Sequence, residues 1–369
     1  MRCLVVVLLL CGLVACASNR GPSLGGERPQ PALVETGREW LPGEEEILFR
    51  VSDGETLAGR RWKGGAGSVN KVIVAVHGVG FYSAVYRDAG KYFSGEGVPV
   101  LAFDLRGHGH STRTEELGHF AGAAVYQRDL RDVVSATRQA YPGARIYIIG
   151  TSLGANIATL LFTDEGIAPE VSGLSLISPV WLRADLAAEP WWWKMLGLFP
   201  ALKLGEETCV ATTTDDVDRI KCWLDDPLVL KALSVDYLNK SLELSAAAAQ
   251  AVLAKGFKVP NLILVGGCDA LVMPEMAYNT LSTLLRDVRG ENSRFAYYPC
   301  GHHALLAGLN RNEVAGDILA WLETPAASLP SKVDENALER FGAIRADHAG
   351  QATCCIRYKG DKPPACLPF

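Results

Sequence analysis

Short runs of hydrophobic residues alternate along the chain with longer segments whose apolar residues recur every three or four positions. The longer segments predict helices, most clearly at residues 121–141, with a final helix at 312–322. The short runs are rich in β-branched residues and predict strands at residues 47–51, 57–62, 71–76, 98–103, 145–149, 173–177, 261–265 and 294–298. The first two strands form an expected antiparallel hairpin. The rest of the alternation predicts an α/β fold, with a mostly parallel sheet and helices on both faces.

This pattern also predicts the domain organisation. The alternation covers residues 45–180 and 251–324, which we expect to form the core. Residues 181–250 interrupt it between two strands and are expected to form an inserted cap or lid. Residues 325–369 are a polar C-terminal extension that contains three cysteines.

The N-terminus has a different character. Residues 1–15 contain one arginine followed by an apolar run too short to cross about 30 Å of hydrocarbon, which is typical of a signal peptide. The run ends in Leu13-Val14-Ala15-Cys16, which resembles the bacterial lipobox, where the cysteine is acylated. We therefore expect a lipid anchor at Cys16 and a location in the bacterial cell envelope, on the outer-membrane or periplasmic side in a cell with two membranes. The alternative is an ordinary secretory signal with an incidental cysteine.

The residues that follow suggest a tether. Residues 16–44 begin with many Gly, Pro and Ser residues and show no helical period, so we expect a lipidated N-terminus followed by a flexible linker.

Composition narrows the possible functions. The 369 residues are 49% hydrophobic and 21% charged, which excludes a fibrous or largely disordered chain. The formal net charge is −5 and no Lys/Arg run occurs, so no nucleic-acid partner is expected.

A candidate nucleophile follows the strand predicted at 145–149. The sequence there is Gly150-Thr151-Ser152-Leu153-Gly154, and a helical run follows. This is G-x-S-x-G in the strand–turn–helix context in which the central serine acts as a nucleophile. The alternative is a serine that only caps the helix.

A serine nucleophile needs a base and an orienting acid, each of which should follow a later strand. Asp269 comes shortly after the strand at 261–265 and is the candidate acid, although it also fits a surface turn. His302 and His303 follow the strand at 294–298. One of the two histidines should be the base, and the other structural or substrate-facing.

An oxyanion hole requires two backbone N–H groups that point at one position. We expect one from Leu153 and the other from Val79, in the loop after the strand at 71–76. His77 in the same loop is expected to be a buried imidazole that braces it. No metal or organic cofactor is expected.

With these residues assembled, the chain resembles the monoacylglycerol lipase/lysophospholipase-like, serine aminopeptidase S33-type branch of the α/β-hydrolases. The matching segments are HGVGFYS at 77–83, FDLRGHGHS at 103–111, GTSLG at 150–154, GGCDALV at 266–272 and YPCGHHALL at 298–306. The resemblance implies the α/β-hydrolase fold with a cap. It also places the base at His303, with His302 at a position that is aromatic in many relatives. Leu153 and Ala155 depart from the family pattern.

The expected cap is rich in tryptophan. Trp181, Trp191, Trp192 and Trp193 are candidates for a substrate pocket or a lipid-contacting lip, although core packing is the ordinary interpretation of an aromatic residue. The expected function is a serine hydrolase that cleaves fatty-acid esters of monoacylglycerol or lysophospholipid type. A thioesterase, small-ester carboxylesterase or aminopeptidase on the same fold remains an alternative, as does an inactive binding lipoprotein. The expected partners are the lipid or small-ester substrate and the membrane, and no protein partner can be inferred.

The ten cysteines suggest disulfides in an exported protein. Cys268 and Cys300 follow neighbouring strands whose spacing fits a disulfide, so we expect this pair, with two buried thiols as the alternative. Further expected pairs are Cys209–Cys222 in the cap, and Cys366 with Cys354 or Cys355.

Overall fold

The computed structural model describes residues 29–65, 67–112, 114–164, 166–167, 170–181, 198–204, 210–272, 274–286 and 292–344. The expected signal peptide, Cys16, Trp191–Trp193, Cys209 and the cysteines of the C-terminal extension lie outside these residues. No helix within the described ranges is long and apolar enough to cross a membrane.

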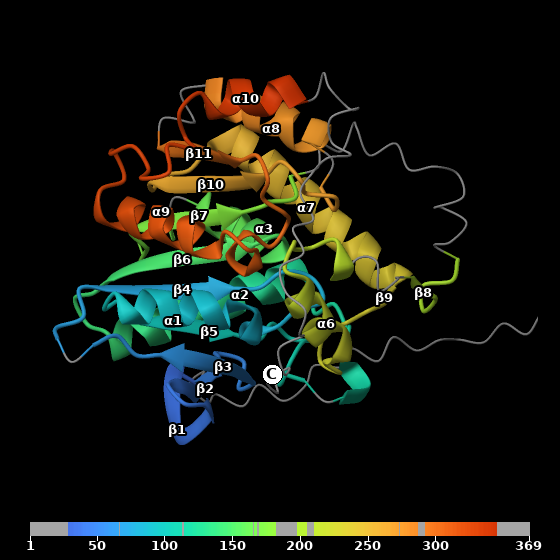
Figure 1. Ribbon diagram of the computed structural model, residues 1–369. Helices are drawn as coiled ribbons and strands as arrows, with labels where there is room; N and C mark the ends of the chain where they lie inside the picture. Colours follow the sequence, from blue (N-terminus) through green and yellow to red (C-terminus); the bar gives the residue numbers. More distant parts are fainter. Residues whose placement is uncertain are drawn as a thin grey trace, which may run out of the picture.

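One nine-stranded sheet organises the described part of the chain, in the order β1-β2-β3-β5-β4-β6-β7-β10-β11 (Figure 1). The six strands from β5 to β11 in this order are parallel, whereas the first three are joined by antiparallel pairing. The prediction of a mostly parallel sheet is confirmed. The strands are β1 (Ala32–Leu41), β2 (Glu44–Arg50), β3 (Thr56–Trp62), β4 (Lys71–Val76), β5 (Val100–Phe103), β6 (Arg145–Thr151), β7 (Gly173–Ile177), β10 (Asn261–Gly266) and β11 (Ser293–Tyr298).

Helices cover both faces of the sheet. On one face, α1 (Arg87–Gly95) and α9 (Arg311–Glu323) contribute to one hydrophobic cluster. The helices of the other face contribute to a second cluster. They are α2 (Ala123–Ala140), α3 (Leu153–Phe162), α7 (Val235–Lys255), α8 (Pro274–Arg286) and α10 (Ala337–Ile344).

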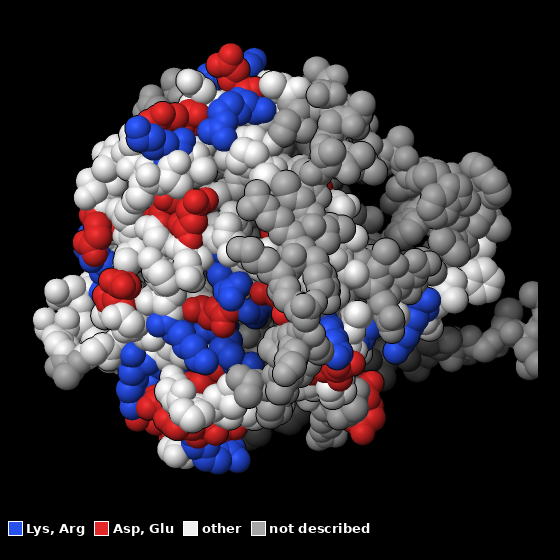
Figure 2. Space-filling view, viewed as in Figure 1, with Lys and Arg blue, Asp and Glu red and all other residues white. Residues whose placement is uncertain are grey.

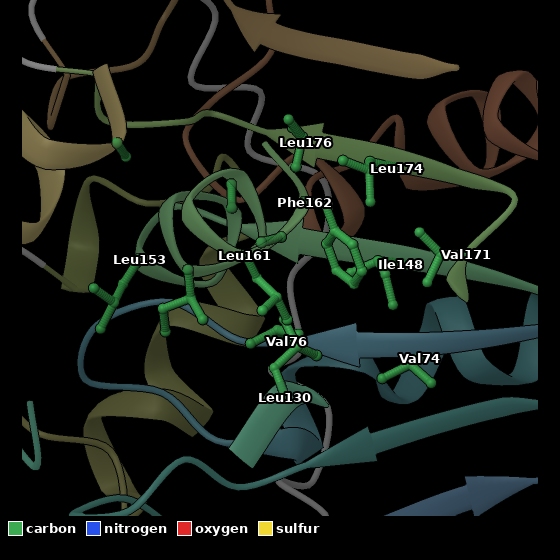
Figure 3. Close-up of a cluster of buried hydrophobic side chains, with 14 of the residues drawn as sticks. Val74, Val76, Leu130, Ile148, Leu153, Leu161, Phe162, Val171, Leu174 and Leu176 are labelled. Atoms are coloured by element: carbon green, nitrogen blue, oxygen red, sulfur yellow. The ribbon is translucent and has the colours of Figure 1, made fainter. Parts of the chain in front are cut away.

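The central strands read as continuous hydrophobic runs because both of their faces are buried. In β4, Val74 and Val76 belong to the α2–α3 side, whereas Ile73 and Ala75 belong to the α1–α9 side. Figure 3 shows part of the cluster on the α2–α3 side, in which Leu161 and Phe162 of α3 pack with Ile148, Leu174 and Leu176 of the neighbouring strands.

The prediction of a flexible linker over residues 16–44 is wrong for the last part of this segment. Residues 32–41 form β1, which pairs with β2 and shows register shifts between Glu35 and Leu41. Apolar residues follow directly on the Pro- and Gly-rich stretch here, and Trp40 Nε1 donates to the Gly59 carbonyl at 3.4 Å. A composition averaged over residues 16–44 hides this strand.

The segment between β7 and β10 contains α6 (Val217–Asp225), α7 and the short paired strands β8 (Lys203–Leu204) and β9 (Leu233–Ser234). Helix α7 packs against α3 and runs beyond the cap boundary that we predicted at residue 250.

The first part of the C-terminal extension packs on the core. Leu329, Val333 and Phe341 are buried, and the Tyr297 amide donates to the Val333 carbonyl at 3.2 Å. Residues 325–344 therefore cover part of the sheet edge at β11, which leaves less of this edge open to pairing with another chain.

Acidic and basic side chains lie close together on the face viewed in Figure 2 rather than in separate patches. A group of ion pairs links three helices. Asp88 of α1 accepts from Arg219 of α6 and from Arg311 of α9, and Arg311 also contacts Asp216, the N-cap of α6.

Candidate active site

Ser152 occupies a sharp turn between β6 and α3. Its backbone has φ 54° and ψ −115°, a conformation that a residue with a Cβ adopts only at a cost. The turn depends on the neighbouring glycines because a Cβ at Gly154 would lie 2.1 Å from the Val76 carbonyl oxygen, and one at Gly150 would lie 2.8 Å from Ala155. The strain and the close packing fix the serine at the carboxyl end of the sheet.

Asp269 and His303 contact each other directly. His303 Nδ1 lies 2.8 Å from Asp269 Oδ2, and both side chains are almost fully buried. The other carboxylate oxygen, Oδ1, accepts from the Leu271 amide at 2.9 Å and the Val272 amide at 3.0 Å. Burial alone would raise the pKa of Asp269, but the His303 imidazole and these amides outweigh it and hold the pKa below its usual range. The carboxylate is therefore kept charged and aimed at the imidazole.

The structure separates the two candidate histidines. His302 is half-buried, and its Nδ1 has no hydrogen-bond partner among the described residues. His303 is held on both sides, because its carbonyl accepts from Ser178 Oγ at 2.9 Å while its ring meets Asp269. The geometry thus favours His303 as the base.

Sequence reasoning missed Ser178. This buried serine follows β7 and has φ 46°. Its hydroxyl holds the loop that carries His303. The sequence signal that could have identified Ser178 is its position as a polar residue directly after the buried strand β7.

A cavity of about 540 Å³ opens beside these residues and is lined by both Ser152 and His303. Most of its wall is apolar and comes from the loop after β4, from α3 and from the segment between β7 and β10. The apolar lining residues include Val79, Phe81, Val85, Leu153, Val180, Val210, Leu230, Leu233, Leu238, Leu242, Leu271 and Val272.

Val79 and Leu153, the expected oxyanion-hole donors, both line this cavity. Within the described ranges, neither the Val79 amide nor the Leu153 amide donates a hydrogen bond to an acceptor. The Ser152 amide, in contrast, donates to the Ile177 carbonyl. His77 braces the Val79 loop as expected, since Nδ1 donates to the Gly78 carbonyl at 2.8 Å and Nε2 accepts from the Leu105 amide at 2.9 Å. Complete burial lowers the pKa of His77 to about 4, so the imidazole is neutral at physiological pH.

Trp181 does not line the cavity, so its expected role in the substrate pocket is wrong. Its indole is 1% exposed, donates to Thr159 Oγ1 at 3.3 Å and packs near Phe257. Residue 159 lies in the buried part of α3, so the tryptophan belongs to the core behind that helix.

The expected Cys268–Cys300 disulfide is also wrong. Cys268 forms a disulfide, but Cys300 is not its partner. The two turns approach so closely that a Cβ at Gly266 would lie 2.2 Å from the Gly301 oxygen, and the Cys268 amide donates to that same oxygen. Cys268 thus lies beside Gly301, whereas Cys300 is exposed within the Tyr298–Gly301 turn. Cys222 also forms a disulfide, and its expected partner Cys209 lies outside the described residues.

Comparison with known proteins agrees with this arrangement of fold and site. The family model described as serine aminopeptidase, S33, matches residues 67–310, which include Ser152, Asp269 and His303. The chain belongs to this family.

Several known proteins resemble the chain over more than half of its length. Human monoglyceride lipase is 27% identical over 310 residues, which cover 81% of this chain and 97% of the relative. Phospholipase YtpA of Bacillus subtilis is 26% identical and covers 54% of this chain and 76% of its own length. The crystal structure of a soluble variant of Saccharomyces cerevisiae monoglyceride lipase has a TM-score of 0.62 at 20% identity, covering 73% of this chain and 92% of that one. The α/β-hydrolase fold predicted from the sequence is confirmed.

Proposed function

We propose that this protein is a serine hydrolase that cleaves fatty-acid esters of monoacylglycerol or lysophospholipid type. The observation that carries the proposal is that Ser152 and the Asp269-bound His303 line one largely apolar cavity. The family is one of hydrolases, and the relatives named monoglyceride lipase and phospholipase make ester hydrolysis its expected chemistry here.

The proposed mechanism follows from the hydrogen bond that His303 already makes to Asp269. His303 Nδ1 faces Asp269, so Nε2 is the nitrogen left to take the proton of Ser152 Oγ. The serine oxygen then attacks the ester carbonyl, while the Leu153 and Val79 amides donate to the oxygen that becomes negative. His303 passes the proton to the leaving alcohol, and water later releases the fatty acid from the acyl-enzyme by the same route in reverse.

The cavity wall supports a fatty acyl group as the part of the substrate that is bound. Its apolar side chains are mainly Val and Leu, and burial of each acyl methylene against them contributes about 0.8 kcal/mol. Affinity should therefore increase with chain length until the cavity is full.

A fluorophosphonate probe tests the chemistry first. The wild-type protein should be labelled at Ser152, and Ser152→Ala should not be labelled. A series of p-nitrophenyl esters and monoacylglycerols with 2 to about 16 acyl carbons then tests the substrate class. A kcat/KM that is highest for acetate or butyrate would contradict the fatty-acid proposal, and absence of probe labelling would contradict the hydrolase proposal.

We also propose that the mature protein is anchored to the cell envelope by lipid on Cys16. Support comes from the Leu13-Val14-Ala15-Cys16 segment at the end of the apolar run. Metabolic labelling with an alkynyl palmitate in a bacterial host should mark the wild-type protein but not Cys16→Ser, and the variant should lose membrane association. Equal labelling of the two proteins would contradict the anchor.

A further inference from the structure

Asn156, a polar residue in the cavity wall, has a hydrogen-bonding group that the described part of the fold does not use. Asn156 lies in α3 four residues after Ser152, and its amide N–H donates to the Ser152 carbonyl at 3.1 Å. Its side chain is fully buried and lines the cavity. Asn156 Oδ1 has no hydrogen-bond donor among the described residues.

The neighbours of Asn156 determine which way its amide faces. Asn156 Nδ2 lies 3.1 Å from the Val180 carbonyl and 2.9 Å from Ser245 Oγ. The Val180 carbonyl can only accept, and the Ser245 hydroxyl already donates to the Ser241 carbonyl at 2.8 Å. Both contacts therefore require the NH₂ group, and a rotated amide would place its oxygen against two acceptors. The atom without a hydrogen-bond partner among the described residues is therefore the acceptor, Asn156 Oδ1.

A buried acceptor without a donor is unfavourable, because it lost its water on folding and gained nothing in return. Such a group on a side chain that lines a substrate cavity indicates that the missing donor comes with the ligand. A hydroxyl is the neutral donor that an ester substrate carries.

We propose that Asn156 Oδ1 accepts a hydrogen bond from a hydroxyl of the substrate, and that the enzyme therefore prefers hydroxyl-bearing esters. This inference rests on the proposed function. Four residues along a helix correspond to about 6 Å, and side chains at i and i+4 share a face. The hydroxyl is therefore expected within a few bonds of the scissile carbonyl, either on the alcohol part of the ester or near the start of the acyl chain.

Matched substrate pairs test the preference and distinguish its two sources. In the alcohol arm, 1-decanoylglycerol is compared with propyl decanoate. In the acyl arm, p-nitrophenyl esters of 3-hydroxy- and 5-hydroxydecanoate are compared with p-nitrophenyl decanoate. We expect kcat/KM to favour the hydroxylated substrate about 10- to 100-fold in one of the arms, since one neutral hydrogen bond to a buried acceptor is at stake.

Two variants then assign the preference to this atom. Asn156→Leu removes the acceptor at similar volume and should reduce the ratio in the responding arm to about 1. Ser245→Ala removes the contact between Asn156 and α7 but keeps Oδ1, so it should retain most of the ratio even if the protein is less stable. If Asn156 only held α7 in place through Ser245, Asn156→Leu and Ser245→Ala would change the kcat/KM ratio of hydroxylated to plain ester equally.

The outcomes are distinguishable. Wild-type ratios below about 3 in both arms would overturn the inference without any variant, as would an Asn156→Leu enzyme that keeps its preference. Hydrolysis of plain and hydroxylated esters alike would leave the proposed function intact. Failure to hydrolyse either member of a pair, together with no fluorophosphonate labelling at Ser152, would instead overturn the proposed function.

Discussion

Ser152 combines a proposed chemical role with an unfavourable backbone conformation. A positive φ at a residue with a Cβ costs of order 1–3 kcal/mol, and the surrounding packing sustains this cost. Replacing the hydroxyl alone and replacing the whole side chain should therefore have different effects on stability.

We predict that Ser152→Ala and Ser152→Gly both lower kcat by about 10⁴- to 10⁶-fold, as in other serine triads. Ser152→Gly should nevertheless have a free energy of unfolding about 1 kcal/mol higher than Ser152→Ala, because glycine relieves the strain. Urea unfolding of the two variants measures this difference. Ala158→Gly, in the interior of α3, is the control and should destabilise the protein. If Ser152→Gly proved less stable than Ser152→Ala, strain would not be stored at this residue.

The two adjacent histidines should differ strongly in their importance. Because His303, and not His302, is hydrogen-bonded to Asp269 among the described residues, His303→Ala should reduce kcat by about 10⁴-fold or more. His302→Ala should stay within about 10-fold of wild type, because it removes a ring that has no contact with the acid. Steady-state kinetics on one p-nitrophenyl ester decides between them, and the reverse order of effects would move the base to His302.

At the level of elements, the sequence predicted best the strands that are buried on both faces. Strands β4, β6 and β10 are almost continuous hydrophobic runs, and the residues directly after them include the candidate catalytic groups. Strand β1 escaped prediction because it is an edge strand with no buried residue and an exposed run at residues 37–39, and its pairing with β2 is non-local information. The same limit applied to Cys268 and Cys300, since strand spacing gives a separation but not the path of two turns.

The ion pairs among α1, α6 and α9 should help to hold the inserted segment on the core. Asn at position 88 cannot pair with Arg219 and Arg311, so Asp88→Asn should lower the free energy of unfolding by about 1 kcal/mol. The loss should shrink in 1 M NaCl, where charges are screened beyond about 3 Å. Asp236→Asn, which removes the exposed i,i+4 pair with Lys240, is the matched control and should cost about 0.5 kcal/mol or less. A loss that is independent of salt would attribute the effect of Asp88 to packing.

For the molecule as a whole, two buried histidines make stability depend on pH. Burial lowers the pKa of His77 to about 4, and burial together with the neighbouring His77 lowers the pKa of His108 to about 3. The unfolded chain binds these protons near pH 6.5, whereas the folded protein does not. The free energy of unfolding should therefore fall as the pH decreases from 6.5 to 5, by up to about 1.4 kcal/mol per pH unit for each histidine.

Urea unfolding between pH 5 and 7.5 measures this slope. His77→Gln removes one of the two sites and should make the slope shallower, whatever it does to stability at neutral pH. A wild-type slope near zero over this range would mean that the two imidazoles do not stay neutral in the folded protein.

Under the proposed lipid anchor at Cys16, the early start of β1 limits how far from the membrane the active site can lie. With lipid on Cys16, only sixteen residue steps separate the membrane surface from Ala32, where the sheet begins. Even a fully extended chain of this length spans no more than about 55 Å. Part of the expected linker is thus a strand of the sheet, and under the proposed anchor the active site would reach only substrates at or near the same membrane surface. Lengthening the tether before Ala32 is accordingly a way to change which lipids the enzyme reaches without altering its chemistry.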